Sequence, residues 1–238
     1  MTGCEDLHRL EILSIHQWAK RAAERLAEAI DEAIERRDRC LMAISGGSTP
    51  GLVFDHLATI ALDWDRVVII QVDERLAPAG GEGRNLVRQR QSFSSLPVSW
   101  LPLPVDDLHA PDDPSAVEAV IADFSARLIA LADDPPVLDI VQLGLGHDGH
   151  TASLFADDPA LVELRHFVAL TGHQYGYRRL TLTRPVLDRA RLALWLIRGP
   201  EKAKPLGGLL AGDLTMPAGL LRPRRSVIVA DTEAARQA

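Results

Sequence analysis

The sequence predicts an α/β fold in which a mostly parallel, open sheet carries helices on both faces, a three-layer, Rossmann-like arrangement. Short apolar runs alternate with helical segments along the chain, which is typical of a parallel sheet covered on both sides. Polar, glycine-rich loops directly follow several of these runs, where open α/β sheets bind ligands. The chain has 238 residues, 47% hydrophobic, and no segment resembles a linker. We therefore expect a single domain over residues 1–238.

The first elements follow from periodicity and from helix-start signals. Apolar residues recur at the helical period over residues 15–37 and predict an amphipathic helix. The apolar run 39–44 predicts a strand, followed by a short loop and a helix that continues to about Ala61. We expect Thr49 to cap this helix with Pro50 at its first position, where a missing N–H does no harm.

The remaining elements continue the alternation. Short apolar runs predict buried strands at residues 66–72, 138–143, 167–170, 180–182, 192–197 and 226–230. Helices are expected at residues 85–93, 115–131 and 199–211. Loops are expected at residues 76–84, in the proline-rich segment 97–114 and, with a short helix, at 156–164.

Composition narrows the class of protein. The net charge of −7 argues against nucleic-acid binding, which depends on basic surface. No apolar run approaches the roughly 20 residues that span a bilayer, and the first residues do not resemble a signal peptide. We expect a cytoplasmic protein with no membrane partner, in which Cys4 and Cys40 are free thiols.

The loop formed by Ser45, Gly46, Gly47, Ser48 and Thr49 lies between a predicted strand and a predicted helix. Backbone N–H groups of such a loop, together with the helix N-terminus, can bind an anion. The loop lacks the lysine of a P-loop and the third glycine of a dinucleotide-binding motif. An ordinary capped turn is the alternative interpretation.

Three charged residues, Asp73, Glu74 and Arg75, follow the next buried strand and should lie at the rim of the sheet. One interpretation is a solvated strand end with a local ion pair. In the functional interpretation Arg75 binds an anion through its planar guanidinium, while the two acids bind sugar hydroxyls or orient a partner.

The most informative segment is residues 143–155, in which glycines alternate with His147, Asp148 and His150 after a buried strand. His150 titrates near neutrality and Asp148 could orient it, which indicates proton transfer. Metal ligation by the same residues is the weaker alternative, because their spacing matches no standard zinc pattern. We therefore expect no metal.

Further cations lie outside predicted strand ends. Arg179 and Lys202 are candidates for closing around a phosphate, whereas Arg178 is interpreted as surface charge. Tyr175 and Tyr177 carry no strong functional signal and are interpreted as packing or loop residues. The G-x-S-x-G signature of serine hydrolases is absent from the sequence.

Taken together in this order, the motifs resemble those of the 6-phosphogluconolactonase family, within the wider superfamily of glucosamine-6-phosphate deaminases. The resemblance covers about residues 43–202, and the closing strand also fits. The matching segments are Ser45-Gly-Gly-Ser-Thr-Pro50, Asp73-Glu-Arg75, Leu143-Gly-Leu-Gly-His-Asp-Gly-His-Thr-Ala-Ser-Leu-Phe155, Arg179-Leu-Thr-Leu-Thr183, and Gly199 with Lys202.

The resemblance implies hydrolysis of 6-phospho-D-glucono-1,5-lactone to 6-phosphogluconate, without a cofactor, in the oxidative pentose phosphate pathway. It implies that His150 activates water and that Arg75, Arg179 and Lys202 hold the phosphate with the Ser45–Thr49 loop. Asp73 matches the position of the base in the deaminases, and here it is expected to orient substrate or support the site. The chain departs from the family pattern at residues 84–85, at 156–157 and at 171–178, where the usual proline pair is missing.

Two other functions remain open. One is a deaminase-like isomerase that acts on an amino-sugar phosphate. The other is a sugar-phosphate-binding regulator, although such regulators normally carry a DNA-binding module and none is visible before Ile15. The sequence is compatible with a monomer or a small homo-oligomer.

Overall fold

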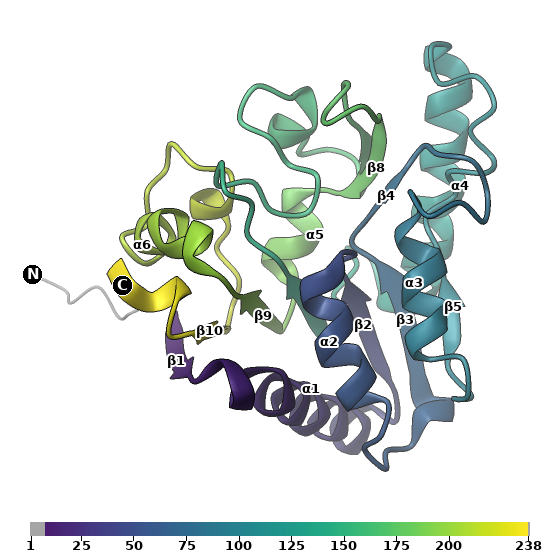
Figure 1. Cartoon of the computed structure of the whole chain (residues 1–238). Helices are drawn as coiled ribbons and strands as arrows, with labels where there is room; N and C mark the ends of the chain where they lie inside the picture. The colour runs from purple at the N-terminus through teal and green to yellow at the C-terminus, as the bar shows by residue number, and fades with distance from the viewer. Residues whose placement is uncertain (1–7, 238) are drawn as a thin grey trace, which may run out of the picture.

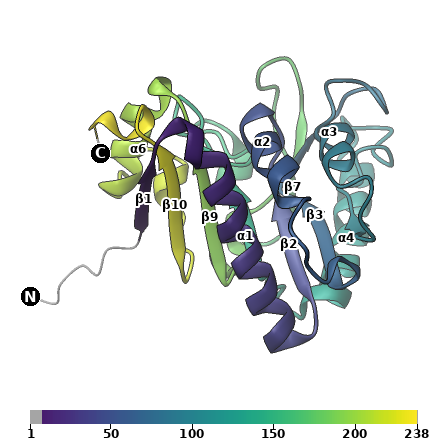
Figure 2. The same ribbon diagram turned by 60° about the horizontal axis from the view of Figure 1, so that its bottom comes forward.

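A parallel, seven-stranded sheet forms the centre of the molecule (Figures 1 and 2), in a computed structural model that describes residues 8–237. Its strand order is β1-β10-β9-β6-β2-β3-β5, and every neighbouring pair is parallel. The strands are β1 (Arg9–Leu13), β2 (Cys40–Ile44), β3 (Val67–Gln71), β5 (Ser99–Leu101), β6 (Ile140–Leu143), β9 (Leu192–Ile197) and β10 (Ser226–Asp231).

Helices cover both faces of this sheet, which confirms the predicted three-layer α/β fold. The helices are α1 (Ile15–Arg37), α2 (Ser48–Leu57), α3 (Asn85–Ser92), α4 (Pro114–Ala132), α5 (Arg184–Arg189) and α6 (Ala203–Leu210). Strand β2 shows why two layers are needed: Met42 and Ile44 pack with α1 and α2, while Leu41 and Ala43 pack with α4, α5 and α6. Successive side chains of a strand point to opposite faces, so a strand that is apolar throughout needs cover on both.

A second, smaller sheet stands beyond the carboxyl end of β3. It contains β4 (Asp73–Arg75), β8 (Arg179–Leu182) and β7 (Val168–Leu170) in the order β4-β8-β7, all antiparallel. Val72 joins the two sheets, because its N–H donates to Ile44 O (2.9 Å) at the end of β2 and its carbonyl accepts from Leu182 N (2.8 Å) in β8. The chain therefore passes from the large sheet to the small one without a loop.

The start of α2 differs from the prediction. The helix begins at Ser48, its N-cap residue is Gly47, and no side chain caps it, so Thr49 lies inside the first turn. Gly47 adopts φ = +104°, a conformation that L side chains rarely adopt. The helix also ends at Leu57, before the predicted boundary near residue 61.

Four short elements were not predicted: the strands β1, β4 and β5 and the helix α5. β1 lies at the sheet edge, and the charged residues Arg9 and Glu11 interrupt it, so it lacks an apolar run. β5 has three residues inside the proline-rich segment, and α5 has only six. The assignment of the whole chain to one domain stays a prediction.

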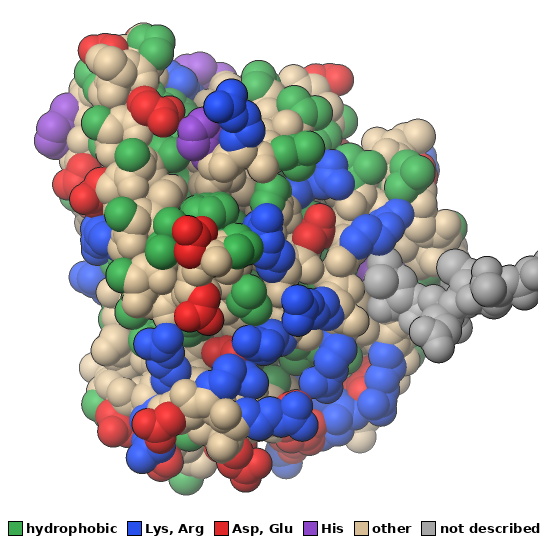
Figure 3. All heavy atoms as spheres, turned by 180° about the vertical axis from the view of Figure 1, so that it is seen from behind, with side chains coloured by type: hydrophobic (Ala, Val, Ile, Leu, Met, Phe, Trp, Pro, Cys, Tyr) green, Lys and Arg blue, Asp and Glu red, His purple; other side chains and the backbone are tan. Residues whose placement is uncertain are grey.

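Basic side chains gather at the lower part of the molecule, where the strands begin (Figure 3). A cavity of ≈ 210 Å³ there is lined by Arg36, Arg37, Arg191, Arg224 and Arg225. Two acids are shared among four of these arginines: Glu32 lies 3.2 Å from Arg36 and 3.3 Å from Arg225, and Asp139 lies 2.6 Å from Arg37 and 3.4 Å from Arg191. This basic cavity lies at the end of the sheet opposite to the predicted site.

The structure also bears on the expectations about membrane-spanning segments and free thiols. Among residues 8–237, no helix is both long enough and apolar enough to cross a bilayer. Cys40 is a free, buried thiol, as predicted, whereas Cys4 lies outside the described residues.

Candidate active site

A cavity of ≈ 300 Å³ opens at the carboxyl ends of β2 and β6, beside the small sheet. It brings together residues that the sequence singled out from five separate segments. Of the predicted site residues, those that line it are Ser45, Gly46, Gly47, Ser48, Thr49, Asp73, Arg75, His150, Arg179 and Lys202. Asp148 does not line the cavity but contacts His150 directly.

The loop after β2 is tied to the neighbouring strand β6. Ser45 N–H donates to Gln142 Oε1 (3.0 Å), and Ser45 Oγ donates to Gln142 O (3.0 Å). Both of these donors of Ser45 are therefore engaged within the protein. The loop leads into the N-terminus of α2, where the first N–H groups have no intrahelical acceptor. This end of the helix can bind an anion.

Gly46 allows this loop to lie against the start of α3. A Cβ at Gly46 would lie 2.0 Å from Asn85 Oδ1, so only glycine fits there. The Asn85 side chain in turn donates from Nδ2 to Asp73 O (3.0 Å). The glycine loop and strand β4 are thus held in one arrangement through a single asparagine.

Strand β4 divides the three charged residues between its two faces. Asp73 and Arg75 line the cavity, and Glu74 does not. Glu74 is completely buried and accepts from Asn85 N, Leu86 N and Gln71 Nε2, each at 2.8 Å. It is the carboxylate at the N-terminus of α3, a favourable place for negative charge, and neither a solvated residue nor a ligand of sugar hydroxyls.

Asp73 is buried and has two partners in the site. Its Oδ2 accepts from Ser153 Oγ (2.6 Å) and lies 3.7 Å from Arg179 Nη1. Asp73 is therefore held as a fixed carboxylate between a hydroxyl and a guanidinium.

His150 and Asp148 form a hydrogen-bonded pair. His150 Nδ1 lies 2.5 Å from Asp148 Oδ1, which also accepts from His150 N–H (3.2 Å). Because an ionised carboxylate can only accept, Nδ1 carries the proton and the lone pair of the neutral ring is on Nε2. Gly146 is required here, since a Cβ would lie 2.1 Å from His150 Nδ1.

The surroundings of this pair favour a neutral imidazole beside an ionised carboxylate. Burial lowers the pKa of His150 below its usual value, although the neighbouring Asp148 carboxylate opposes this. Burial alone would raise the pKa of Asp148, but the charge and hydrogen bonds of His150, together with a hydrogen bond from Tyr175, lower it to about 2. At neutral pH the pair can accept a proton at Nε2.

Arg179 is the most buried cation of the site. It is 7% exposed, and its guanidinium lies 5.7 Å from the centre of the Phe155 ring. Burial lowers its pKa from the usual value, while the charge of Asp73 opposes this shift. Its Nε finds no hydrogen-bond partner within residues 8–237, so it can donate to a ligand.

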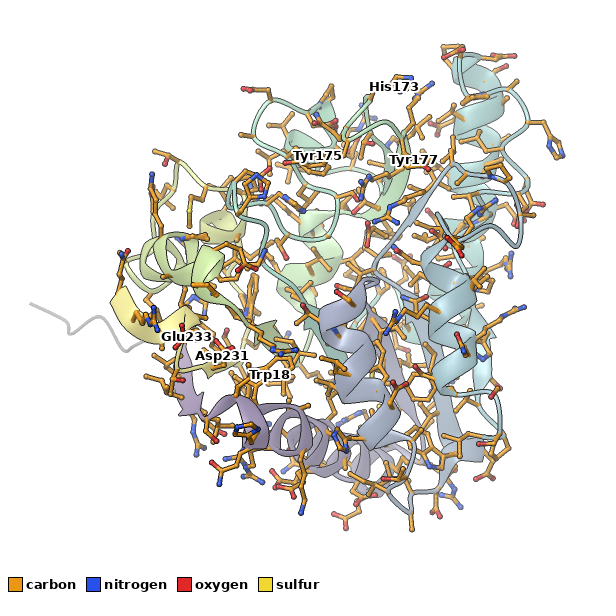
Figure 4. The ribbon with its side chains drawn as sticks, viewed as in Figure 1. Trp18, His173, Tyr175, Tyr177, Asp231 and Glu233 are labelled. Carbon is orange, nitrogen blue, oxygen red and sulfur yellow. The ribbon has the colours of Figure 1, made fainter. Side chains whose placement is uncertain are left out.

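Lys202 reaches the cavity from a short 3₁₀ helix, η3 (Pro200–Lys202), that follows β9. Asp231, buried at the end of β10 (Figure 4), accepts from Gly199 N–H (3.1 Å) and fixes the turn before Lys202. Arg198 also lines the cavity, although no motif pointed to it. By contrast, Arg178 lies outside the cavity, where it is partly buried, pairs with Asp112 (2.8 Å) and donates to Pro111 O (2.8 Å).

Sequence reasoning missed two side chains that touch the acid–base residues. Ser153 binds Asp73, and Tyr175 donates to Asp148 Oδ2 (2.9 Å). Ser153 lies within the motif of residues 143–155 and could have been found there. Nothing in the sequence around Tyr175 indicates that it lies against Asp148, 27 positions earlier.

The proposed alternative of a metal site finds no support among residues 8–237, in which no three potential ligands gather. His147 lines the cavity, and its ring centre lies 6.3 Å from that of Tyr175. The chemistry of the site thus consists of one proton acceptor, one fixed carboxylate and four cations around an anion-binding loop.

Known proteins share the sequence pattern and the fold of this chain. The model of the family described as "Glucosamine-6-phosphate isomerases/6-phosphogluconolactonase" matches residues 14–230. A 6-phosphogluconolactonase of Synechocystis is 31% identical over 216 residues, 88% of each chain. One of Mesorhizobium japonicum is 33% identical over 222 residues, which cover 89% of this chain and 86% of that protein. The structure of a 6-phosphogluconolactonase from Trypanosoma cruzi superposes with a TM-score of 0.84 at 24% identity, covering 99% of this chain and 98% of the other.

Proposed function

Because the chain belongs to the glucosamine-6-phosphate isomerase/6-phosphogluconolactonase family, we propose that it hydrolyses 6-phospho-D-glucono-1,5-lactone to 6-phosphogluconate. This is a step of the oxidative pentose phosphate pathway. Relatives more than 30% identical over most of their length carry the name of this activity. The observation that carries the proposal is the hydrogen-bonded Asp148–His150 pair beside a cavity lined by cations.

His150 is the proposed general base. Its Nε2 takes a proton from water, and the resulting hydroxide equivalent attacks the lactone carbonyl carbon. The C–O bond to the ring oxygen then breaks, and the proton on His150 passes to that oxygen. Asp148 stays ionised throughout and stabilises the imidazolium. A positioned base of this kind contributes about 10²–10⁴-fold to the rate.

The cations hold the phosphate and polarise the lactone. We assign Arg75, Arg179 and Lys202 to the phosphate, together with the N–H groups of the Ser45–Thr49 loop after Ser45, whose own N–H donates to Gln142. Arginine suits this role because its planar fork matches phosphate oxygens. Binding energy from the phosphate, which does not react, positions the ring at His150.

We assign Asp73 a supporting role. Its carboxylate accepts from Ser153 and faces Arg179, so it is already partnered in the free protein. It can accept a further hydrogen bond from a sugar hydroxyl and so fix the orientation of the ring. No cofactor takes part in this mechanism, and we place the reaction in the cytoplasm, carried out by a monomer or a small homo-oligomer.

The test is lactone hydrolysis by the wild type and by His150→Ala, with the spontaneous rate subtracted. We expect rapid turnover by the wild type and a loss of about 10²–10⁴-fold in kcat in the variant. A folded wild type without turnover would overturn the proposal. Glucosamine 6-phosphate would then be the next substrate, since it would reveal a deaminase.

A further inference from the structure

Residues 171–178 form a hairpin that connects β7 to β8 and carries His173, Tyr175 and Tyr177 (Figure 4). It is one of the three segments in which the sequence departs from the motif pattern on which the resemblance rests. Gln174 and Tyr177 form an isolated antiparallel bridge, with Gln174 N–H donating to Tyr177 O (2.9 Å) and Tyr177 N–H to Gln174 O (3.2 Å). The hairpin therefore turns at Tyr175 and Gly176.

The turn holds Tyr175 in an uncommon backbone conformation. Tyr175 has φ = +49° and Gly176 has φ = +82°, and positive φ at both central residues is the pattern of a type I′ turn. Asparagine or aspartate usually precedes the glycine in such turns, and a bulky residue with positive φ is an outlier. A conformation of this kind persists when surrounding contacts determine it, and it is often found at functional sites.

Those contacts lead to the proposed base. Tyr175 Oη donates to Asp148 Oδ2 (2.9 Å), while Asp148 Oδ1 takes the hydrogen bonds from His150. The two oxygens of one carboxylate are thus divided between the tyrosine and the histidine. Rotation of a carboxylate about its last torsion is soft, so a donor on each oxygen fixes its plane.

The tyrosine ring adds a second constraint. Its centre lies 6.2 Å from that of His150 and 5.9 Å from that of Phe155, and Phe155 lies 4.5 Å from His150. Tyr175 is 59% exposed, so its place over the site comes from the turn and the hydrogen bond rather than from burial.

We propose that Tyr175 is a positioning residue, which fixes the Asp148 carboxylate and through it the orientation and basicity of His150. This inference rests on the proposed function for its kinetic test, because it assigns His150 the role of base. It does not depend on that function for the structural link among the three side chains.

The basicity follows from how Asp148 shares its charge. A hydrogen bond from Tyr175 draws electron density from the carboxylate, which leaves less for the imidazolium form of His150. Without the phenol hydroxyl, Asp148 would stabilise protonated His150 more strongly. The pKa of His150 should then rise, and the carboxylate should rotate more freely.

The experiment compares Tyr175→Phe with Tyr177→Phe. Tyr177 is the matched control, because the same hairpin carries it and its hydroxyl makes no hydrogen bond within residues 8–237. The Tyr177 ring lies 6.0 Å from the Arg75 guanidinium, and a phenylalanine at this position retains that ring. Steady-state kinetics are measured against pH, and the pKa of His150 is measured by NMR titration of its ring protons.

For Tyr175→Phe we expect kcat to fall about tenfold, as for loss of one hydrogen bond to a charged group. KM should stay within about twofold, since Tyr175 does not line the cavity. The acid limb of the pH profile and the NMR titration of His150 should both move to higher pH. Tyr177→Phe should change neither the limb nor kcat.

The two proposals fail in different ways. If the wild type hydrolyses the lactone and Tyr175→Phe matches it in kcat and in the pKa of His150, the inference is wrong and the function stands. If the wild type shows no turnover, the function fails, and the NMR titration alone decides the inference. A lower pKa of His150 in Tyr175→Phe would also overturn it.

Discussion

His150 uses Nδ1 for its hydrogen bond with Asp148. Its chemistry therefore depends on whether the other ring nitrogen, Nε2, is protonated. Burial lowers its pKa below 6.5, and a general base acts only when it is unprotonated. We therefore expect kcat/KM to be constant at neutral pH and to fall as the pH drops through a value below 6.5. The measurement is kcat/KM for lactone hydrolysis over about pH 5 to 8, after subtraction of the spontaneous rate.

Asp148→Asn provides the control for that profile. An amide lacks the negative charge that favours the imidazolium, so the acid limb should move to still lower pH while kcat decreases. A wild-type profile that is flat across this range would show that another group is the base.

Arg75 is expected to bind the phosphate group of the substrate. Its Nη1 donates to Gly83 O (3.0 Å), and its buried Nε has no partner within residues 8–237. Arg75→Ala should raise KM for the phosphorylated lactone by about 10- to 150-fold, as for the loss of one charge-assisted contact. The unphosphorylated lactone should lose far less. Equal losses for both substrates would show that Arg75 does not bind the phosphate.

At the scale of single residues, the proposed base and the phosphate-binding cations could be predicted from the sequence, but not all of the residues that position them. His150, Arg75 and Arg179 could be predicted because charged residues after a buried strand lie at one edge of a parallel sheet. Tyr175 could not, because its contact with Asp148 depends on how a hairpin of another sheet turns, and Tyr-Gly is not a usual signal of a type I′ turn.

At the scale of elements, the glycine loop and α3 are fitted to one another. Gly46→Ala would place a methyl group 2.0 Å from Asn85 Oδ1 and displace the side chain that holds Asp73 O. Overpacking of this kind costs about 1–3 kcal/mol of stability, and we expect KM to rise as well. Chemical denaturation and steady-state kinetics check the two effects.

Gly207→Ala is the matched control for that substitution. Gly207 lies inside α6, where, among residues 8–237, a Cβ would meet only Gln237 O at 3.4 Å, an ordinary contact. Alanine is favoured over glycine in a helix interior by about 0.5–1 kcal/mol. If Gly46→Ala is as stable and active as Gly207→Ala, the loop does not need its glycine.

Elements with a long, regular pattern were predicted well, and short ones were not. Helix α1 shows its apolar stripe over 23 residues, whereas β5 has only three residues and lies in a segment whose prolines indicate a loop. Of the small sheet, only β7 and β8 were predicted as strands, and β4 was interpreted as charged residues at the rim of the large sheet. The pairing of β4 with β8 joins residues more than 100 positions apart, and local pattern carries no information about such pairing.

At the scale of the whole molecule, ligand binding at the site should stabilise the fold. 6-Phosphogluconate at about 100 times its Kd should add about 2.7 kcal/mol, a rise in Tm of roughly 5–10 °C for a chain of this size. Differential scanning fluorimetry with and without the ligand measures it. In Arg75→Ala the same concentration should give a much smaller shift. A full shift in that variant would place the ligand elsewhere, for example in the basic cavity at the opposite end of the sheet.

Val72 is the single residue between β3 and β4, and it fixes the spacing between the two sheets. Its N–H is bound in the large sheet and its carbonyl in the small one. The connection between β3 and β4 therefore cannot absorb an insertion or a deletion. Adding or removing one residue here would exchange the two faces of β4. Glu74 would then face the cavity, while Asp73 and Arg75 would turn toward α3. Whether Asp73 and Arg75 or Glu74 face the cavity therefore depends on there being a single residue between β3 and β4.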